Sequence, residues 1–169
     1  MILNRLFVIS VIITLSWMVL MGSLVKPLNS QDIVVFELAK TPEVAAAIVK
    51  EWREKDLTGN AMKSICLDFV FLLLYSISIG LGCVLLSRFT QNELLIQSGS
   101  VLSKGVPLAG LCDVVENLAM LKTLIGSVTS LPVTIAYWFA AVKFLIVVVS
   151  LLFLLICLIF GGVKMVFKK

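Results

Sequence analysis

The sequence contains no histidine, and charged residues make up only 14% of its 169 positions. Soluble domains carry about 25% charged residues, so the composition points away from a soluble fold. Without histidine, the chain lacks the commonest metal ligand and the commonest general base. We therefore predict no metal site and no cofactor. The basic residues form no stripe interleaved with aromatic residues, so nucleic acid is not expected as a partner.

The cysteines also lack the pattern of a redox centre. Cys66, Cys83, Cys112 and Cys157 all fall in apolar runs, and none belongs to a CxxC pair. A membrane thiol oxidoreductase needs two thiol groups within attacking distance of each other, so this class of enzyme is not expected. We interpret the four cysteines as small buried hydrophobic residues.

Four long apolar runs account for a composition that is 60% hydrophobic, with a mean hydropathy of +1.12. A helix needs about 20 apolar residues to cross a hydrocarbon core of about 30 Å, and each run reaches that length. The chain is therefore predicted to be an all-α membrane protein that forms a single domain over 1–169. Its four spans, arranged as an antiparallel bundle, are expected at about 6–24, 65–86, 106–125 and 133–163.

The first apolar run follows Arg5 and so resembles a signal peptide. However, the run at 6–24 is longer than the roughly 7–15 apolar residues of a signal peptide, and no A-x-A cleavage site closes it. We interpret it as a retained first span, with cleavage as the alternative.

One substantial polar region, 26–63, separates the first two spans and is predicted to form an extracytoplasmic cap. Its segment DIVVFEL shows alternation of polar and apolar residues and contains β-branched residues, which favours a short extended piece. The stretch TPEVAAAIVKEWREKDLTGN predicts an amphipathic helix. Thr41 suits the N-cap of that helix and Pro42 its first position.

Within this stretch, Val44, Ile48 and Trp52 recur at helical spacing, and Gly59 with Asn60 suits the end of the helix. We expect the helix to pack as a lid on the membrane face of the bundle. Binding of a partner protein is the alternative role.

The other two connections are predicted at 87–105 and at 126–132, the second being short enough for a tight antiparallel hairpin. Lysine and arginine near span ends mark the cytoplasmic side. Basic residues on the two sides are nearly equal in number, but the 26–63 loop also holds six acidic residues. The predicted cytoplasmic side contains both termini and carries Arg5, Arg88, Lys104, Lys164, Lys168 and Lys169.

The stretch GLCDVVENLAMLK places polar side chains inside the third predicted span. Asp113, Glu116 and Asn117 are spaced i, i+3 and i+4, so they share one face of a helix. At a rise of about 1.5 Å per residue, Lys143 and Tyr75 lie at a similar depth in their own spans. A charged group at the bilayer centre costs at least about 2.5–3.5 kcal/mol. We therefore expect Lys143 to pair with Asp113 or with Glu116.

A second pair is expected between Asp68 and Lys122, nearer the outer surface. Because one lysine cannot neutralise two carboxylates, at least one carboxyl group is expected to hold a proton and to donate to Tyr75 or to a backbone carbonyl. The predicted polar cluster comprises Asp113, Glu116, Asn117, Lys143, Tyr75 and Asp68.

Three roles for this cluster remain open at the level of sequence. Buried ion pairs can fix helix register without any further function. Intramembrane ionisable residues also mark binding sites for ligands, ions or protons. Carboxylates, a lysine and a tyrosine can perform acid–base catalysis, but the sequence has no nucleophile elbow and no glycine-rich phosphate loop.

Three short motifs resemble a group of small, uncharacterised four-span bacterial membrane proteins. They are FELAKTPEVA at 36–45, LDFVFLLLY at 67–75 and DVVEN at 113–117. The resemblance covers most of the chain. It implies a four-helix architecture in a bacterial inner membrane and implies nothing about chemistry.

The expected function is a non-enzymatic one: a binding or structural module for a lipid-like ligand or for a partner protein. The alternatives are a transporter or proton-coupled module that uses the carboxylates, and a membrane enzyme that acts on lipid. Expected partners are membrane lipid, and either a second copy of the chain or another membrane protein.

Overall fold

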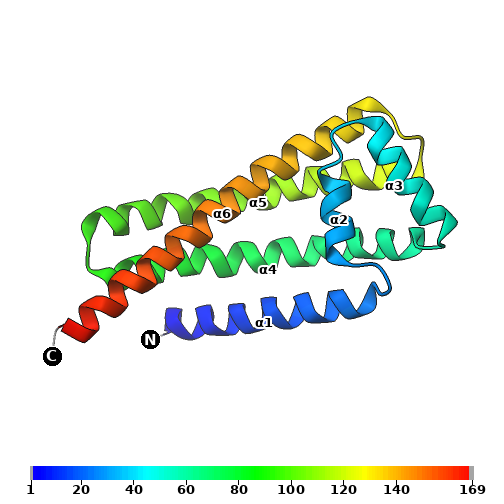
Figure 1. The fold of residues 1–169 in the computed structure, drawn as a ribbon. Helices are drawn as coiled ribbons and strands as arrows, with labels where there is room; N and C mark the ends of the chain where they lie inside the picture. The colour runs from blue at the N-terminus through cyan, green and yellow to red at the C-terminus, as the bar shows by residue number, and fades with distance from the viewer. Residues whose placement is uncertain (1, 168–169) are drawn as a thin grey trace.

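The computed structural model describes residues 2–167, which form six helices and no strand (Figure 1). Four of the helices are long and two are short. In chain order they are α1 (Ile2–Leu24), α2 (Ser30–Glu37), α3 (Pro42–Glu54), α4 (Thr58–Thr90), α5 (Glu93–Ile125) and α6 (Ser130–Phe167). The all-α prediction is confirmed for this part of the chain.

The four long helices lie side by side and alternate in direction along the chain (Figure 1). Helix α4 contacts α1, α5 and α6, and α5 also packs on α6. Both ends of the chain lie at one end of this bundle, whereas α2 and α3 cover the other end (Figure 1). Lys168 and Lys169, on which the predicted orientation partly rests, lie outside the described residues.

Three helices in the described part of the chain are long and apolar enough to cross a membrane. They are α1, α4 and the portion of α6 from Ser130 to Gly162. Helix α5 is as long as α4 but contains more charged residues in its central part. That α5 is a fourth span therefore remains a prediction.

The predicted polar connection at 87–105 is wrong. Helix α4 continues to Thr90 and α5 begins at Glu93, so only Gln91 and Asn92 join them. The turn is made by Gln91, which adopts a left-handed conformation with φ of 53°. Asn92 then caps α5, because its side chain accepts a hydrogen bond of 3.2 Å from the Leu95 amide. Local capping defines this boundary better than the loss of hydrophobicity does.

The segment DIVVFEL is also not extended, because it lies in α2. The Asp32 carboxylate accepts a hydrogen bond of 2.9 Å from the Asn29 amide at the start of this helix. Ile33, Phe36 and Glu37 are buried and follow the i, i+3, i+4 spacing of one helical face. Packing of this face against the bundle overrides the β preference of the valines in the segment.

Helix α3 begins as predicted, with Thr41 at the N-cap and Pro42 at the first position. It ends at Glu54, however, so Gly59 and Asn60 belong to the start of α4 instead of closing α3. The Asn60 amide donates hydrogen bonds of 3.0 and 2.7 Å to the carbonyls of Val25 and Lys26, which secures the end of α1.

The buried face of α3 differs slightly from the predicted one. Ala45, Val49 and Trp52 are buried, whereas Val44 is 48% exposed. Trp52 packs edge-on against Phe36, with ring centroids 5.1 Å apart. The contact joins α3 to α2, so that the two short helices form one cap over the bundle.

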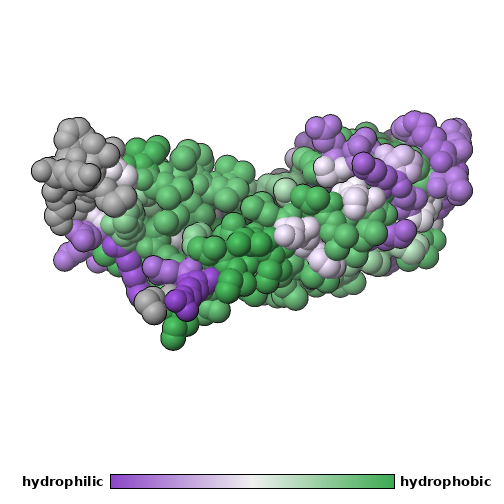
Figure 2. Space-filling model, turned by 90° about the horizontal axis from the view of Figure 1, so that it is seen from below, coloured by the Kyte–Doolittle hydropathy of each residue, from purple (hydrophilic) through white to green (hydrophobic). Residues whose placement is uncertain are grey.

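Close approach of α4 and α5 depends on small residues. A Cβ atom on Gly99 would lie 2.5 Å from the Cys83 carbonyl oxygen, and one on Gly110 would lie 2.9 Å from Ser76 Oγ. Cys83 and Cys157 are buried as predicted, but Cys66 is exposed. Figure 2 shows an extensive apolar surface over the long helices, with hydrophilic side chains gathered at the two ends, including the end that carries the cap.

Candidate functional site

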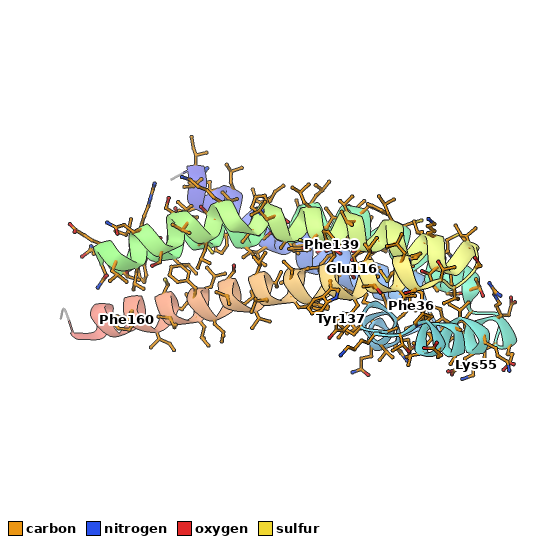
Figure 3. All side chains as sticks on the ribbon, turned by 90° about the horizontal axis from the view of Figure 1, so that it is seen from above. Phe36, Lys55, Glu116, Tyr137, Phe139 and Phe160 are labelled. Carbon is orange, nitrogen blue, oxygen red and sulfur yellow. The ribbon has the colours of Figure 1, made fainter. Side chains whose placement is uncertain are left out.

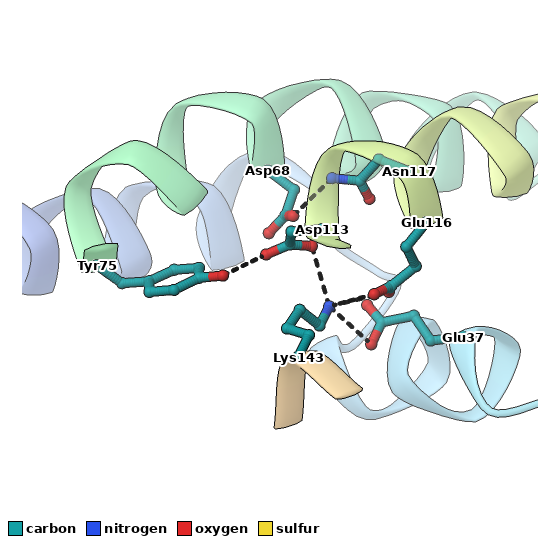
Figure 4. Close-up of polar contacts among 7 residues, drawn as sticks. All are labelled: Glu37, Asp68, Tyr75, Asp113, Glu116, Asn117 and Lys143. Atoms are coloured by element: carbon teal, nitrogen blue, oxygen red, sulfur yellow. Dashed lines mark hydrogen bonds and ion pairs between the residues drawn. The ribbon is translucent and has the colours of Figure 1, made fainter. Parts of the chain in front are cut away.

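Lys143 is the centre of a buried polar cluster between α5 and α6 (Figure 4). Its ammonium group donates to Asp113 Oδ1 at 3.0 Å and to Glu116 Oε1 at 2.9 Å. The second oxygen of Glu116 also lies 2.9 Å from Lys143 Nζ. The ammonium is 4.7 Å from the centroid of the Phe144 ring, a distance that permits a cation–π contact. Lys143 thus pairs with both candidate carboxylates and not with one of them.

A third carboxyl group reaches Lys143 from the cap. Glu37, near the end of α2, places Oε2 3.5 Å from Lys143 Nζ, and its side chain is 9% exposed. Figure 3 shows Glu116 and Phe36 toward the end of the long helices that carries the cap. The ion pair between Glu37 and Lys143 ties the cap to α6.

Helix α4 supplies the remaining members of the cluster. The Tyr75 hydroxyl donates to Asp113 Oδ2 at 2.9 Å, so both oxygens of Asp113 are engaged. The amide of Asn117 donates to Asp68 Oδ2 at 2.8 Å. All six predicted residues therefore lie in one region, and the structure adds Glu37 to them (Figure 4).

The expected pair between Asp68 and Lys122 does not form. Lys122 is exposed on α5, and Asp68 is instead bonded to Asn117. Residue depth along a helix predicted the pair, but depth alone does not fix which way a side chain points. The rotation of α5 turns Asn117 toward α4 and Lys122 toward the outside.

Sequence reasoning missed Glu37 because its segment was interpreted as extended. Two signals in the sequence were available. Glu37 is the only acidic residue in the run IVVFELA, and together with Ile33 and Phe36 it completes an i, i+3, i+4 face. A helix in place of a strand would have turned Glu37 to the same side as the two apolar residues.

The charges of the cluster do not balance. Three carboxyl groups, those of Glu37, Asp113 and Glu116, lie within 3.5 Å of the Lys143 ammonium, and the carboxyl group of Asp68 belongs to the same cluster. Buried charges that lack a partner are strongly unfavourable. The surplus negative charge has to be balanced by protons or by a cationic ligand. Burial raises the pKa of the Glu37 carboxyl above its ordinary value, although the nearby Lys143 ammonium acts in the opposite direction.

An apolar groove leads from this cluster along the long helices. A cavity of about 420 Å³ lies between α1, α4 and α6, and Lys143 and Tyr75 lie at its polar end. The other twelve side chains that line it are almost all apolar: Phe7, Val11, Thr14, Leu15, Met18, Phe71, Ser78, Ile79, Phe144, Val147, Leu151 and Leu154.

A second cavity, of about 380 Å³, continues the groove beneath the cap. It is lined by Glu37 of α2, Asp68 of α4 and Lys143 of α6, together with apolar side chains of α1. The two cavities share four lining residues: Met18, Phe71, Lys143 and Phe144. The apolar groove and the polar chamber are therefore adjoining parts of one amphipathic space.

Helix α1 forms one wall of the groove and is held in place by few polar contacts. Thr14 Oγ1 lies 2.8 Å from Ser78 Oγ, and the Trp17 indole donates to the Leu67 carbonyl at 3.4 Å. At the far end, Phe7 of α1 and Leu154 of α6 both approach Gly82. Phe7 and Leu154 line the apolar end of the groove, whereas Lys143 and Tyr75 line its polar end.

The search against known proteins returned no match among protein-family models, curated proteins or solved structures. In the described residues, no group of three or more histidine, cysteine, aspartate or glutamate side chains is arranged to hold a metal ion. Inference about function therefore rests on the geometry of the cluster and of the groove.

Proposed function

We propose that this protein is a small integral membrane protein that binds one chain of a lipid-like amphiphile in the groove beside α1. The amphiphile's polar head meets the cluster around Lys143, and its tail lies between α1 and α6. One observation carries the proposal: an apolar cavity adjoins a polar, carboxylate-lined one, and the two share four lining residues. Binding sites for amphiphiles combine an apolar lining with a few convergent polar groups in this way.

The dimensions of the groove support a ligand with an acyl-type chain. Along α1 the lining runs from Phe7 to Met18, a distance of about 16 Å at 1.5 Å per residue. This is close to half of a hydrocarbon core of about 30 Å. A single chain that crosses one leaflet would fill the groove from its apolar end to the charged cluster.

The proposal includes α5 as the fourth membrane span. Lys104 and Lys122 are both exposed on α5 and lie about 27 Å apart along it. The exposed side chains between them include Leu108, Leu111 and Leu118, whereas Asp113 and Glu116 are buried. An apolar outer face of this length suits lipid, and the charged residues inside the bundle are shielded from it.

We further propose a bacterial inner membrane with both termini in the cytoplasm and with α2 and α3 as an extracytoplasmic cap. The basic residues near the span ends support this orientation. So does the mixed charge of α3, whose exposed face holds the ion pair between Lys50 and Glu54. The three motifs that resemble small bacterial membrane proteins support the location.

The binding proposal is tested by obstructing the groove. Leu151 lines the groove and is 49% exposed, and its neighbour Leu152 is 55% exposed but lies outside the lining. We expect Leu151→Trp to reduce co-purifying amphiphile, measured by native mass spectrometry, by about tenfold, equivalent to about 1.4 kcal/mol. Leu152→Trp is the matched control and should retain the wild-type amount. Equal occupancy in both variants would contradict the proposal.

Proton-coupled transport is a second candidate, favoured by the surplus of carboxyl groups around Lys143. Chains of buried carboxyl groups in membranes act as proton relays in pumps and transporters. Reconstitution into liposomes with a pH-sensitive dye tests this candidate. Transport requires a proton flux that Glu116→Gln removes, whereas the binding function requires none.

A further inference from the structure

We propose that the polar end of the groove selects an amphiphile whose headgroup carries an ammonium group, which binds between Glu37 and Asp68. The inference rests on the proposed function and specifies its ligand class. Both carboxyl groups line the cavity of about 380 Å³ beneath the cap, one from α2 and the other from α4.

The distribution of partners within the cluster decides which charges are available to a ligand. Lys143 lies within 3.0 Å of both Asp113 and Glu116, so these two carboxyl groups take up its positive charge. Glu37 is more distant, with Oε2 3.5 Å from Lys143 Nζ. This oxygen is buried and, apart from this longer ion pair, takes part in no hydrogen bond. Glu37 itself lines the cavity, so its carboxyl group still has acceptor capacity for a ligand there.

Asp68 is the second available acidic group. Its hydrogen bond in the described structure comes from the neutral amide of Asn117, through Oδ2. Asp68 lines the cavity and is half-buried, so its carboxyl group is accessible from within it. Asp68 has no ion pair among the described residues, and Glu37 shares its cation, Lys143, with two closer carboxyl groups. Both line one chamber, and a cationic donor complements both of them.

The adjoining apolar groove indicates that this cation is the head of an amphiphile and not a free amine. The chamber is continuous with the groove through Met18, Phe71 and Phe144, which line both cavities. Burying an alkyl chain contributes about 0.8 kcal/mol per CH₂ group in transfer from water. A ligand that fills only the chamber would leave the larger, apolar cavity unused.

The test compares dodecyl chains that differ only in their heads, bound to the full-length protein in a non-ionic detergent at pH 7. Dodecylamine, dodecanol and dodecanoate are titrated separately and counted by native mass spectrometry, with ethylamine as the chain-free competitor. We expect dodecylamine to bind about tenfold more tightly than dodecanol, dodecanoate to bind most weakly, and ethylamine not to displace dodecylamine.

Two variants test the headgroup site and the apolar groove separately. Glu37→Gln, on the cap, is expected to remove most of the preference for dodecylamine over dodecanol while leaving dodecanol binding unchanged. Leu151→Trp should weaken binding of both compounds. Glu43→Gln, an exposed substitution at the start of α3, is the control for Glu37→Gln and should keep the wild-type preference.

Each outcome has a distinct meaning. Equal binding of dodecylamine and dodecanol, still sensitive to Leu151→Trp, would overturn the headgroup inference and leave groove binding intact. Insensitivity of both compounds to Leu151→Trp would overturn the proposed function as well. Displacement by ethylamine at the concentration at which dodecylamine competes would show a site for a free cation, which contradicts an amphiphile ligand.

Discussion

Lys143 on α6 and Glu116 on α5 lie 2.9 Å apart inside the bundle, although 27 positions separate them in the chain. Glu116 is fully buried and Lys143 is 6% exposed. Since neither group has access to bulk water, Glu116 depends on Lys143 for its charge compensation, and Lys143 depends on Glu116, Asp113 and Glu37. The pair therefore contributes both to the stability of the fold and to the properties of the candidate site.

A double-mutant cycle on this pair measures that dependence. Lys143→Met is expected to destabilise the protein by about 3–5 kcal/mol, because it leaves buried carboxyl groups without a cation. Glu116→Gln should cost less, because Asp113 still pairs with Lys143. In the double variant we expect a smaller loss than the sum of the single losses, measured as thermal unfolding in detergent.

The exposed pair of Lys50 and Glu54 on α3 provides the control for this cycle. Its two side chains are 78% and 66% exposed, so Lys50→Met should leave the unfolding temperature close to that of the wild type. If Lys143→Met were equally neutral, the buried charges would not stabilise the fold, and a hydrated ligand or proton site would be the better description of the cluster.

Glu37 makes stability depend on pH in a defined direction. Burial raises its pKa above the ordinary value of 4.5, so the folded state binds a proton more readily than the unfolded state. The stability that Glu37 contributes is therefore greatest below pH 4.5 and is lost as the pH rises through the folded pKa. We expect the unfolding temperature of the wild type to fall relative to that of Glu37→Gln as the pH increases.

The pH dependence of stability expected from Glu43 has the opposite sign, so Glu43→Gln serves as the control. Its pKa is lowered by a hydrogen bond with its own backbone and by one with Thr41, so its contribution is present above pH 4.5 and is lost as the pH falls. Any effect of Glu43→Gln should be small, because the side chain is exposed. The same pH trend in both variants would contradict a special environment around Glu37.

Tyr75→Phe removes the hydrogen bond of 2.9 Å to Asp113 Oδ2 and leaves that oxygen buried without a donor. The expected loss of stability is about 1–3 kcal/mol, measured by thermal unfolding in detergent. Tyr137→Phe, on α6 and outside the cluster, is the matched control. Comparable losses in the two variants would show that the hydrogen bond from Tyr75 to Asp113 adds no stability beyond that of a tyrosine hydroxyl outside the cluster.

The contact between α4 and α5 is tested with glycine substitutions. Gly99→Ala would place a Cβ atom 2.5 Å from the backbone oxygen of Cys83, so the two helices would have to separate, and we expect a marked loss of stability. At Gly105 nothing lies within 4 Å of such an atom. Gly105→Ala should therefore be neutral or stabilise α5 by up to about 1 kcal/mol. Equal effects of the two substitutions would contradict this packing.

The proposed topology is tested with reporter fusions in a bacterial host. Green fluorescent protein fused after Lys169 should fluoresce, because that end is proposed to be cytoplasmic. Alkaline phosphatase inserted between Asp56 and Leu57, at the junction of α3 and α4, should be active, because this enzyme needs the extracytoplasmic side. A dark C-terminal fusion together with an inactive inserted phosphatase would overturn the orientation. A dark C-terminal fusion together with an active inserted phosphatase would argue against four spans.

Local sequence was enough to predict the helical class and the start of α3, with Thr41 at the N-cap and Pro42 at the first position. It also predicted four membrane spans, and three of the helices are long and apolar enough to be spans. These features depend on composition and on neighbours within four residues, which is the information that local sequence holds. The common face of Asp113, Glu116 and Asn117 follows in the same way from helical periodicity.

The partners of the polar residues in the cluster follow from the tertiary structure. It turned Asn117 and not Lys122 toward Asp68, gave Lys143 both Asp113 and Glu116, and folded the segment around Glu37 into a helix that adds a further carboxyl group. The register and rotation of one helix against another depend on side-chain packing along their whole contact. No periodicity within a single segment encodes that packing, so the cluster became complete only when the cap and the three helices α4, α5 and α6 came together.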